Sequence, residues 1–193
     1  MNVSRVVLGL LGWVEDLVAD PDREYSTEED RMRLVIELSW LNVAHGTGGT
    51  FGAGAFDLGT NRLVAPGANL VAATDLSTAH AEIVALIIVQ QIGDHFDLGN
   101  WGRPLYELVA SKEPCAQCFG SVPWSGVRRL MCRARDEDVR DKGFDEGPKM
   151  PGWVSSWERR GITMACDVCC DEAAAVSRSP PRVEADQQRS PGE

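Results

Sequence analysis

Basic residues are scarce in this sequence: 19 Lys and Arg stand against 29 Asp and Glu, and the formal net charge is −10. Proteins that bind nucleic acid gain most of their affinity by neutralising phosphates with Lys and Arg. A chain with this balance repels phosphates over much of its surface. We therefore expect a small-molecule partner and no nucleic acid.

Long apolar runs are also missing. The N-terminal stretch VVLGLLGWVEDLV is interrupted by Glu15 and Asp16, and no small-residue cleavage pattern follows it. No run reaches the roughly 18 to 20 apolar residues that a membrane span requires. The six cysteines include two C-x-x-C spacings, which favour thiols or metal over disulfides. We expect a cytoplasmic protein with no membrane association.

The 193 residues are 44% hydrophobic and 25% charged, enough to bury the core of one domain over residues 1–176. Residues 1–45 predict a helical segment. Its first helix is capped near Ser4 and ends before Pro21, and its second opens with a capping box of Ser26 and Glu29. The Pro- and Ser-rich residues 177–193 predict a polar tail.

Strand and helix patterns alternate after this segment. The predicted elements are a hairpin of strands 51–57 and 62–71, strands 105–111, 127–134 and 161–166, helices 78–92, 115–124, 136–141 and 170–176, and a short helix between residues 152 and 161. Such alternation implies an α/β fold, a three-layer α/β/α sandwich whose mixed sheet carries helices on both faces.

The stretch STAHAEIVAL places His80 and Glu82 two residues apart at the start of an apolar run. Alone, the pair is typical of a rim histidine and a first-turn acid. The later stretch EPCAQC adds Cys115 and Cys118. H-x-E followed by P-C-x-x-C is the signature of zinc nucleobase deaminases. We therefore predict Zn²⁺ held by His80, Cys115 and Cys118, with Glu82 as the proton shuttle.

A rival model joins the C-x-x-C pair 115/118 to Cys166 and Cys169 as a structural four-cysteine zinc ribbon. Residues 119 to 165 separate the two pairs, far more than the roughly 15 to 20 typical of such ribbons. The ribbon also leaves the histidine and its neighbouring acid unexplained. For the remaining thiols, Cys132 and the group Cys166, Cys169 and Cys170, plain packing is the favoured interpretation.

Together these motifs resemble the bacterial guanine deaminases of the cytidine-deaminase-like superfamily. The resemblance runs from Phe51 to Thr163 and is strongest in STAHAEI, EPCAQCFGSVPWSGV and ARDEDVRDKGFDEGP. It implies the cytidine-deaminase-like fold, hydrolytic deamination of guanine to xanthine and ammonia, a zinc cofactor and a homodimer. Carried over by position, it implies that Glu146 holds the base and assists proton transfer. The substrate-binding residues that it implies are Asn69, Phe51, Ala81, Trp124 and Phe144.

Other functions stay open. The same metal chemistry would serve guanosine, another aminopurine, a pterin or an aminotriazine such as ammeline. A tRNA adenosine deaminase is disfavoured by the charge of −10. A zinc-stabilised binding module without catalysis would need a fourth protein ligand and would have no use for Glu82.

Overall fold

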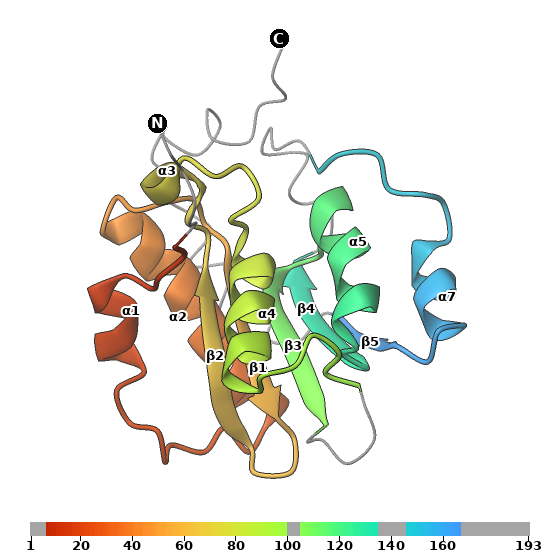
Figure 1. Ribbon diagram of the computed structural model, residues 1–193, viewed down its shortest axis with the longest axis horizontal. Helices are drawn as coiled ribbons and strands as arrows, with labels where there is room; N and C mark the ends of the chain where they lie inside the picture. The colour runs from red at the N-terminus through yellow and green to blue at the C-terminus, as the bar shows by residue number, and fades with distance from the viewer. Residues whose placement is uncertain (1–6, 100–104, 135–145, 167–193) are drawn as a thin grey trace, which may run out of the picture.

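The computed structural model describes residues 7–99, 105–134 and 146–166. Its strands form one sheet in the order β2-β1-β3-β4-β5 (Figure 1). The strands are β1 (Gly52–Asp57), β2 (Arg62–Ala68), β3 (Tyr106–Lys112), β4 (Arg129–Ala134) and β5 (Thr163–Ala165). β1 runs antiparallel to β2 and β3, whereas β3, β4 and β5 are parallel. The predicted mixed sheet is confirmed.

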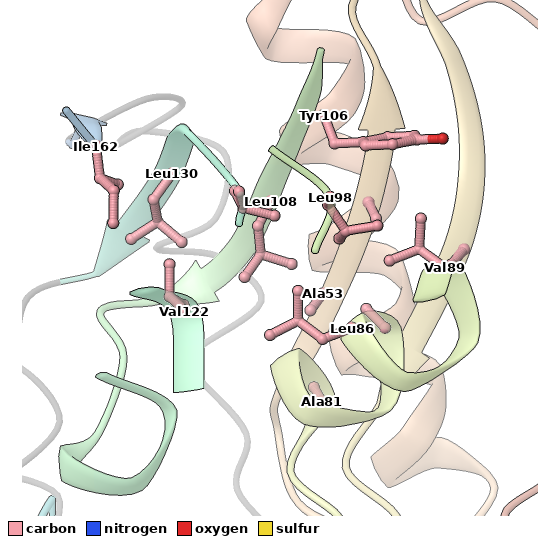
Figure 2. Packing of buried hydrophobic residues seen from close by; sticks show 14 of the residues in the cluster. Ala53, Ala81, Leu86, Val89, Leu98, Tyr106, Leu108, Val122, Leu130 and Ile162 are labelled. Carbon is pink, nitrogen blue, oxygen red and sulfur yellow. The ribbon is translucent and has the colours of Figure 1, made fainter. Parts of the chain in front are cut away.

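Helices cover both faces of this sheet (Figure 1). One face carries α2 (Glu28–Ala44), and the other carries α4 (Ala81–Ile92), α5 (Ala116–Ser125) and α7 (Trp153–Glu158). Figure 2 shows side chains of α4 and α5 meeting those of β1, β3 and β4 in the buried layer between them. Two short helices, α1 (Gly12–Leu17) and α3 (Val71–Thr74), complete the described elements. The predicted three-layer α/β/α sandwich is confirmed.

Two glycines let helices lie directly on the strands. A Cβ at Gly52 of β1 would come within 2.3 Å of the Val35 oxygen in α2. A Cβ at Gly67 of β2 would come within 2.2 Å of the Ala81 oxygen in α4. Real Cβ atoms do not approach backbone so closely, so each glycine permits a close helix–strand contact. The contact at Gly67 positions the start of α4, directly after the predicted metal ligand His80.

The N-terminal helices differ from the prediction. The first was expected from near Ser4, but residues 7–11 are not helical and α1 spans only Gly12–Leu17. Glycines at 9 and 12 disfavour an earlier start, because glycine loses the most conformational freedom in a helix. The capping box of α2 is formed by Thr27 and Asp30 instead of Ser26 and Glu29. The chain is still extended at Tyr25, whose amide donates to the Asn61 oxygen, so the helix starts later.

Several predicted elements lie outside the described residues, namely helices 136–141 and 170–176 and the tail 177–193. Within the described residues, no helix combines the length and the apolar character that crossing a membrane takes.

A buried ion-pair network joins α2 to the sheet at the end where β3 begins. Glu107 is fully buried, and its Oε2 accepts a hydrogen bond of 2.7 Å from Nε of Arg31. Its other oxygen pairs with Nε of Arg129, and that guanidinium also contacts Glu28. Arg31 further donates to the Tyr25 carbonyl at 2.9 Å. Each buried charge of this network therefore has a partner of opposite sign, as burial requires.

Replacing Glu107 with Ala is expected to lower the free energy of unfolding by about 3–5 kcal/mol, because Arg31 would stay buried without its carboxylate. Chemical denaturation followed by circular dichroism measures the change. Glu158→Ala, at an exposed position of α7, is the matched control and should shift the value by less than about 0.5 kcal/mol. Equal effects in both variants would contradict a structural role for the network.

Candidate active site

The candidate site lies at one edge of the sheet, where β2 and β3 end and β1 begins. Asn69 follows directly after β2, Glu113 follows β3, and Phe51 precedes β1. Because β1 is antiparallel to both neighbours, these three positions share the same edge. Ligands of open α/β sheets commonly bind at the carboxyl ends of strands. The topology alone therefore gathers residues from three separate parts of the chain.

Two helices begin at this edge and bring the metal-ligating side chains together. His80 is the N-cap residue of α4 and Cys115 that of α5, and neither side chain caps its own helix. The Cys115 Sγ lies 3.3 Å from Nδ1 of His80. Cys118, one turn into α5, places its Sγ 3.5 Å from the same nitrogen. Both sulfurs therefore lie close to the same imidazole nitrogen of His80.

This cluster fits zinc. The three ligand atoms all lie within 4.8 Å of one another, and both cysteines are buried. Tetrahedral bonds of about 2.3 Å to sulfur and about 2.0 to 2.1 Å to nitrogen correspond to an N···S separation of about 3.5 Å. The two observed separations agree with that value. Three protein ligands leave the fourth position for water or substrate, as in catalytic zinc sites.

The thiols interact strongly with each other and with the imidazole. A hydrogen bond with Cys118 lowers the pKa of Cys115 to about 4, helped by His80 and opposed by burial. The same hydrogen bond, with burial, raises the pKa of Cys118. Burial acts to lower the pKa of His80, but Cys115 outweighs it and raises that pKa. The lowered pKa of Cys115 favours the thiolate form that binds a divalent cation, and such a cation would displace the proton of Cys118.

Two buried carboxyl groups face a hollow next to this cluster. The hollow is lined by Phe51, Asn69, His80, Glu82, Glu113, Cys115 and Glu146. Glu82 is 6% exposed and Glu146 is 2% exposed. Burial, and then the charge of Cys115, raise the pKa of Glu82. A carboxyl group so placed beside metal ligands is suited to carrying a proton.

Asn69 is held firmly in the wall of the hollow. Its side-chain Oδ1 accepts from the Val71 amide at 3.2 Å, and its backbone amide donates to the Phe51 oxygen at 3.1 Å. Its carbonyl accepts from Nδ2 of the buried Asn42 at 2.8 Å. Since Oδ1 is engaged, the Nδ2 group is the end suited to donate to an acceptor on a ligand ring. Ala81 is fully buried in the first turn of α4 and does not line the hollow.

Trp124, which the resemblance implies as a pocket wall, does not line this hollow. Trp124 is 82% exposed and lines a separate groove between α4 and α5. It lies six residues beyond Cys118 on the same helix, a rise of about 9 Å, so it is carried away from the metal-ligating turn. Phe144 lies outside the described residues.

The structure adds two charged residues that the motifs did not single out. Glu113 lines the hollow, and its Oε1 accepts from Nζ of Lys149 at 2.7 Å. Their side chains are 12% and 6% exposed. The prolines that follow Glu113 and precede Lys149 are signals of fixed backbone, but nothing in the local pattern indicates that the two segments meet. Only the fold reveals this pair.

Cys132 and Cys166 lie apart from the metal cluster. Their sulfurs are 3.3 Å from each other, next to the paired strands β4 and β5. Cys166 therefore does not join the two cysteines of α5, which argues against the four-cysteine ribbon. Cys169 and Cys170 lie outside the described residues.

Comparisons with known proteins agree with this geometry. The family model of the cytidine and deoxycytidylate deaminase zinc-binding region matches residues 25–134. The guanine deaminase of Bacillus subtilis (strain 168) is 30% identical over 118 residues, which cover 61% of this chain and 71% of that protein.

Solved structures are more similar still. The guanine deaminase from Nitrosomonas europaea superposes with a TM-score of 0.85 and 42% identity over 91% of this chain and 95% of that one. The protein NE0047 in complex with 2,6-diaminopurine superposes with a TM-score of 0.83 and 43% identity, over 88% and 89% of the two chains. The chain therefore belongs to the zinc-dependent deaminase family defined by the cytidine and deoxycytidylate deaminase zinc-binding region.

Proposed function

We propose that this chain hydrolyses guanine to xanthine and ammonia. The observation that carries the proposal is the hollow in which Glu82, Glu146 and Asn69 surround the cluster of His80, Cys115 and Cys118. The guanine deaminase from Nitrosomonas europaea covers 91% of this chain at 42% identity. The family match to residues 25–134 contains every one of these residues except Glu146. Water supplies the oxygen that replaces the amino group at C2, and the departing nitrogen leaves as ammonia.

Bound zinc would supply hydroxide at neutral pH, since zinc can lower the pKa of a ligand water to about 7. The chain's own residues do the rest. Glu82 accepts the proton from the attacking water and returns it to a ring nitrogen next to C2. Glu146 holds the base and assists protonation of the leaving amine. Asn69 donates from Nδ2 to a ring acceptor, and Phe51 covers one side of the base.

The test is ammonia release by the zinc-loaded protein with guanine, compared with guanosine, adenine, cytosine, cytidine and ammeline. Rapid release from guanine alone is the expected result. Release from another ring instead would overturn the substrate assignment while keeping the metal chemistry. Binding of 2,6-diaminopurine, the ligand in the NE0047 complex, would report on occupation of the same hollow.

Glu146→Ala is expected to lower kcat/KM for guanine by about 100-fold, the lower end of what one acid–base group contributes. The backbone oxygen that Ala116 contacts is retained, so zinc content should not change. Steady-state kinetics and metal analysis measure both quantities. Glu158→Ala, exposed on α7, controls for the loss of any carboxylate. An unaffected Glu146→Ala variant would remove this residue from the mechanism.

We further propose that the protein is a homodimer, as the resemblance implies. The groove between α4 and α5 supports this, because it leaves Phe96 77% and Trp124 82% exposed on one surface. Burying such side chains is worth about 1.5–3 kcal/mol each. Trp124→Glu should therefore convert a dimer to a monomer in sedimentation-velocity experiments. A monomeric wild-type protein would refute the dimer.

We also propose that the protein is cytoplasmic. Cys115 and Cys118 at the metal cluster are free thiols, and such thiols need a reducing environment to stay free. Fractionation of cells that express the tagged chain tests it, and recovery from an extracellular or membrane fraction would contradict it.

A further inference from the structure

We propose that Lys149 is a positioning residue that clamps the segment bearing Glu146 against the first turn of α5. The inference rests on the proposed function, because it gives Lys149 a task at the same site. It concerns how the second carboxyl group of the site, that of Glu146, is held in place.

The clamp is attached at both ends of a four-residue segment. At one end, the Ala116 amide donates to the Glu146 carbonyl at 2.9 Å. At the other end, Nζ of Lys149 donates to Oε1 of Glu113 at 2.7 Å and to the Pro114 carbonyl at 3.0 Å. Residues 146–149 are thus fastened to residues 113–116, the stretch that contains the zinc ligand Cys115.

The residues between the two anchors suit this close contact. Gly147 has φ +67°, in the left-handed region that favours glycine, and a Cβ there would lie 2.9 Å from the Ala116 Cβ. Pro148 has a fixed φ and lowers the entropy lost when the segment is ordered. The sequence Glu-Gly-Pro-Lys therefore acts as one unit, with the functional carboxyl group at one end and the anchoring ammonium at the other.

Burial makes the Lys149 anchor matter. Its side chain is 6% exposed, and its Nζ lies 4.9 Å from the ring centroid of Trp153 as well as against Glu113. Removing one partner of a buried pair is costly for the charge that stays. Here the Glu113 carboxylate would lose its contact with Lys149, and this carboxylate lines the same hollow as Glu82 and Glu146. Lys149 thus balances one of three acidic groups around the substrate.

Loss of the anchor should reach catalysis through Glu146. A displacement of about 1 Å of a catalytic group can cost about 100-fold in rate. Lys149 has no place among the side chains that line the hollow, so its effect should depend on Glu146 being present. That dependence separates positioning from general stability.

The first measurement is hydrogen–deuterium exchange of the zinc-loaded protein. In Lys149→Met, the Ala116 amide is expected to exchange about tenfold faster than in the wild type, because its acceptor segment is released. Lys149→Arg should restore most of the protection, since Arg can pair with the same carboxylate. Arg159→Met, at the exposed C-cap position that follows α7, is the control cation and should change nothing at Ala116.

The second measurement is turnover. Lys149→Met should lower kcat/KM for guanine by at least about tenfold with zinc retained, yet by less than about threefold when added to Glu146→Ala. Full loss in both backgrounds, or unchanged Ala116 exchange in Lys149→Met, would overturn the clamp. If Lys149→Met loses zinc or fails to fold, Glu113→Gln weakens the same pair and is tested identically.

The proposed function and the Lys149 clamp can be refuted independently of each other. A wild-type protein that releases no ammonia from guanine refutes the proposed function, but the exchange of the Ala116 amide still decides whether the clamp exists. A guanine deaminase whose Ala116 exchange ignores Lys149 keeps its function and loses the clamp.

Discussion

Glu82→Gln is expected to retain one zinc per chain and to lower kcat for deamination by about a thousandfold, within the range of 10² to 10⁴ that general acid–base catalysis contributes. Gln has the same shape and can still form hydrogen bonds at this buried position, but its amide cannot carry a proton. The carboxyl group of Glu82 is not among the metal-ligating groups of the described residues. Metal binding and proton transfer should therefore separate in this variant.

The measurements are zinc content by mass spectrometry of metals and single-turnover rates of ammonia release. Glu82→Asp serves as a second variant, because it keeps the acid and shortens its reach. Glu158→Gln, on the surface of α7, should behave as wild type. Turnover of Glu82→Gln within twofold of the wild type would show that another group moves the proton.

Cys115→Ala should abolish zinc binding and activity together. A catalytic zinc site with three protein ligands retains only His80 and Cys118 after this change. The variant should also lose the stabilisation that metal binding gives to the folded state, so added zinc should no longer raise its Tm. Zinc stoichiometry and Tm with and without zinc measure these effects.

Cys132→Ala is the matched control for this experiment. Cys132 is also buried, and its sulfur lies 3.3 Å from that of Cys166, outside the metal cluster. This variant should retain zinc and turnover, with only the modest destabilisation of a small core truncation. Loss of zinc from Cys132→Ala would contradict its packing role, and loss of zinc from Cys166→Ala would revive the structural ribbon in place of the catalytic site.

Much of the fold was predictable because its signals are local. Periodic apolar residues fixed the order of the strands and helices, and the motif HAE with PCAQC identified the metal cluster. Boundaries were less predictable. Two overlapping capping boxes compete in STEED, and the extended backbone at Tyr25 selects the later one, a tertiary effect that no window of sequence contains.

The walls of the site were predictable only where a residue follows directly from a strand end. Asn69 and Phe51 meet because β1 and β2 pair, so their positions follow from the hairpin. Trp124 was placed at the pocket by resemblance, although its helix carries it to another surface. The Lys149–Glu113 pair joins segments 36 residues apart. Such long-range contacts produce no periodic pattern in the sequence from which they could be predicted.

The two ends of β3 serve different purposes, stability at one end and catalysis at the other. Glu107, the second residue of the strand, forms the buried ion pairs that hold the layers together. The far end of the strand leads into the turn that carries Cys115. In a mutational scan, substitutions near the start of this strand should reduce the amount of protein, whereas those beyond its end should reduce the rate per molecule. Substitutions selected for a new substrate ring can therefore change the pocket at one end of β3 without lowering the stability that the ion pairs at the other end provide.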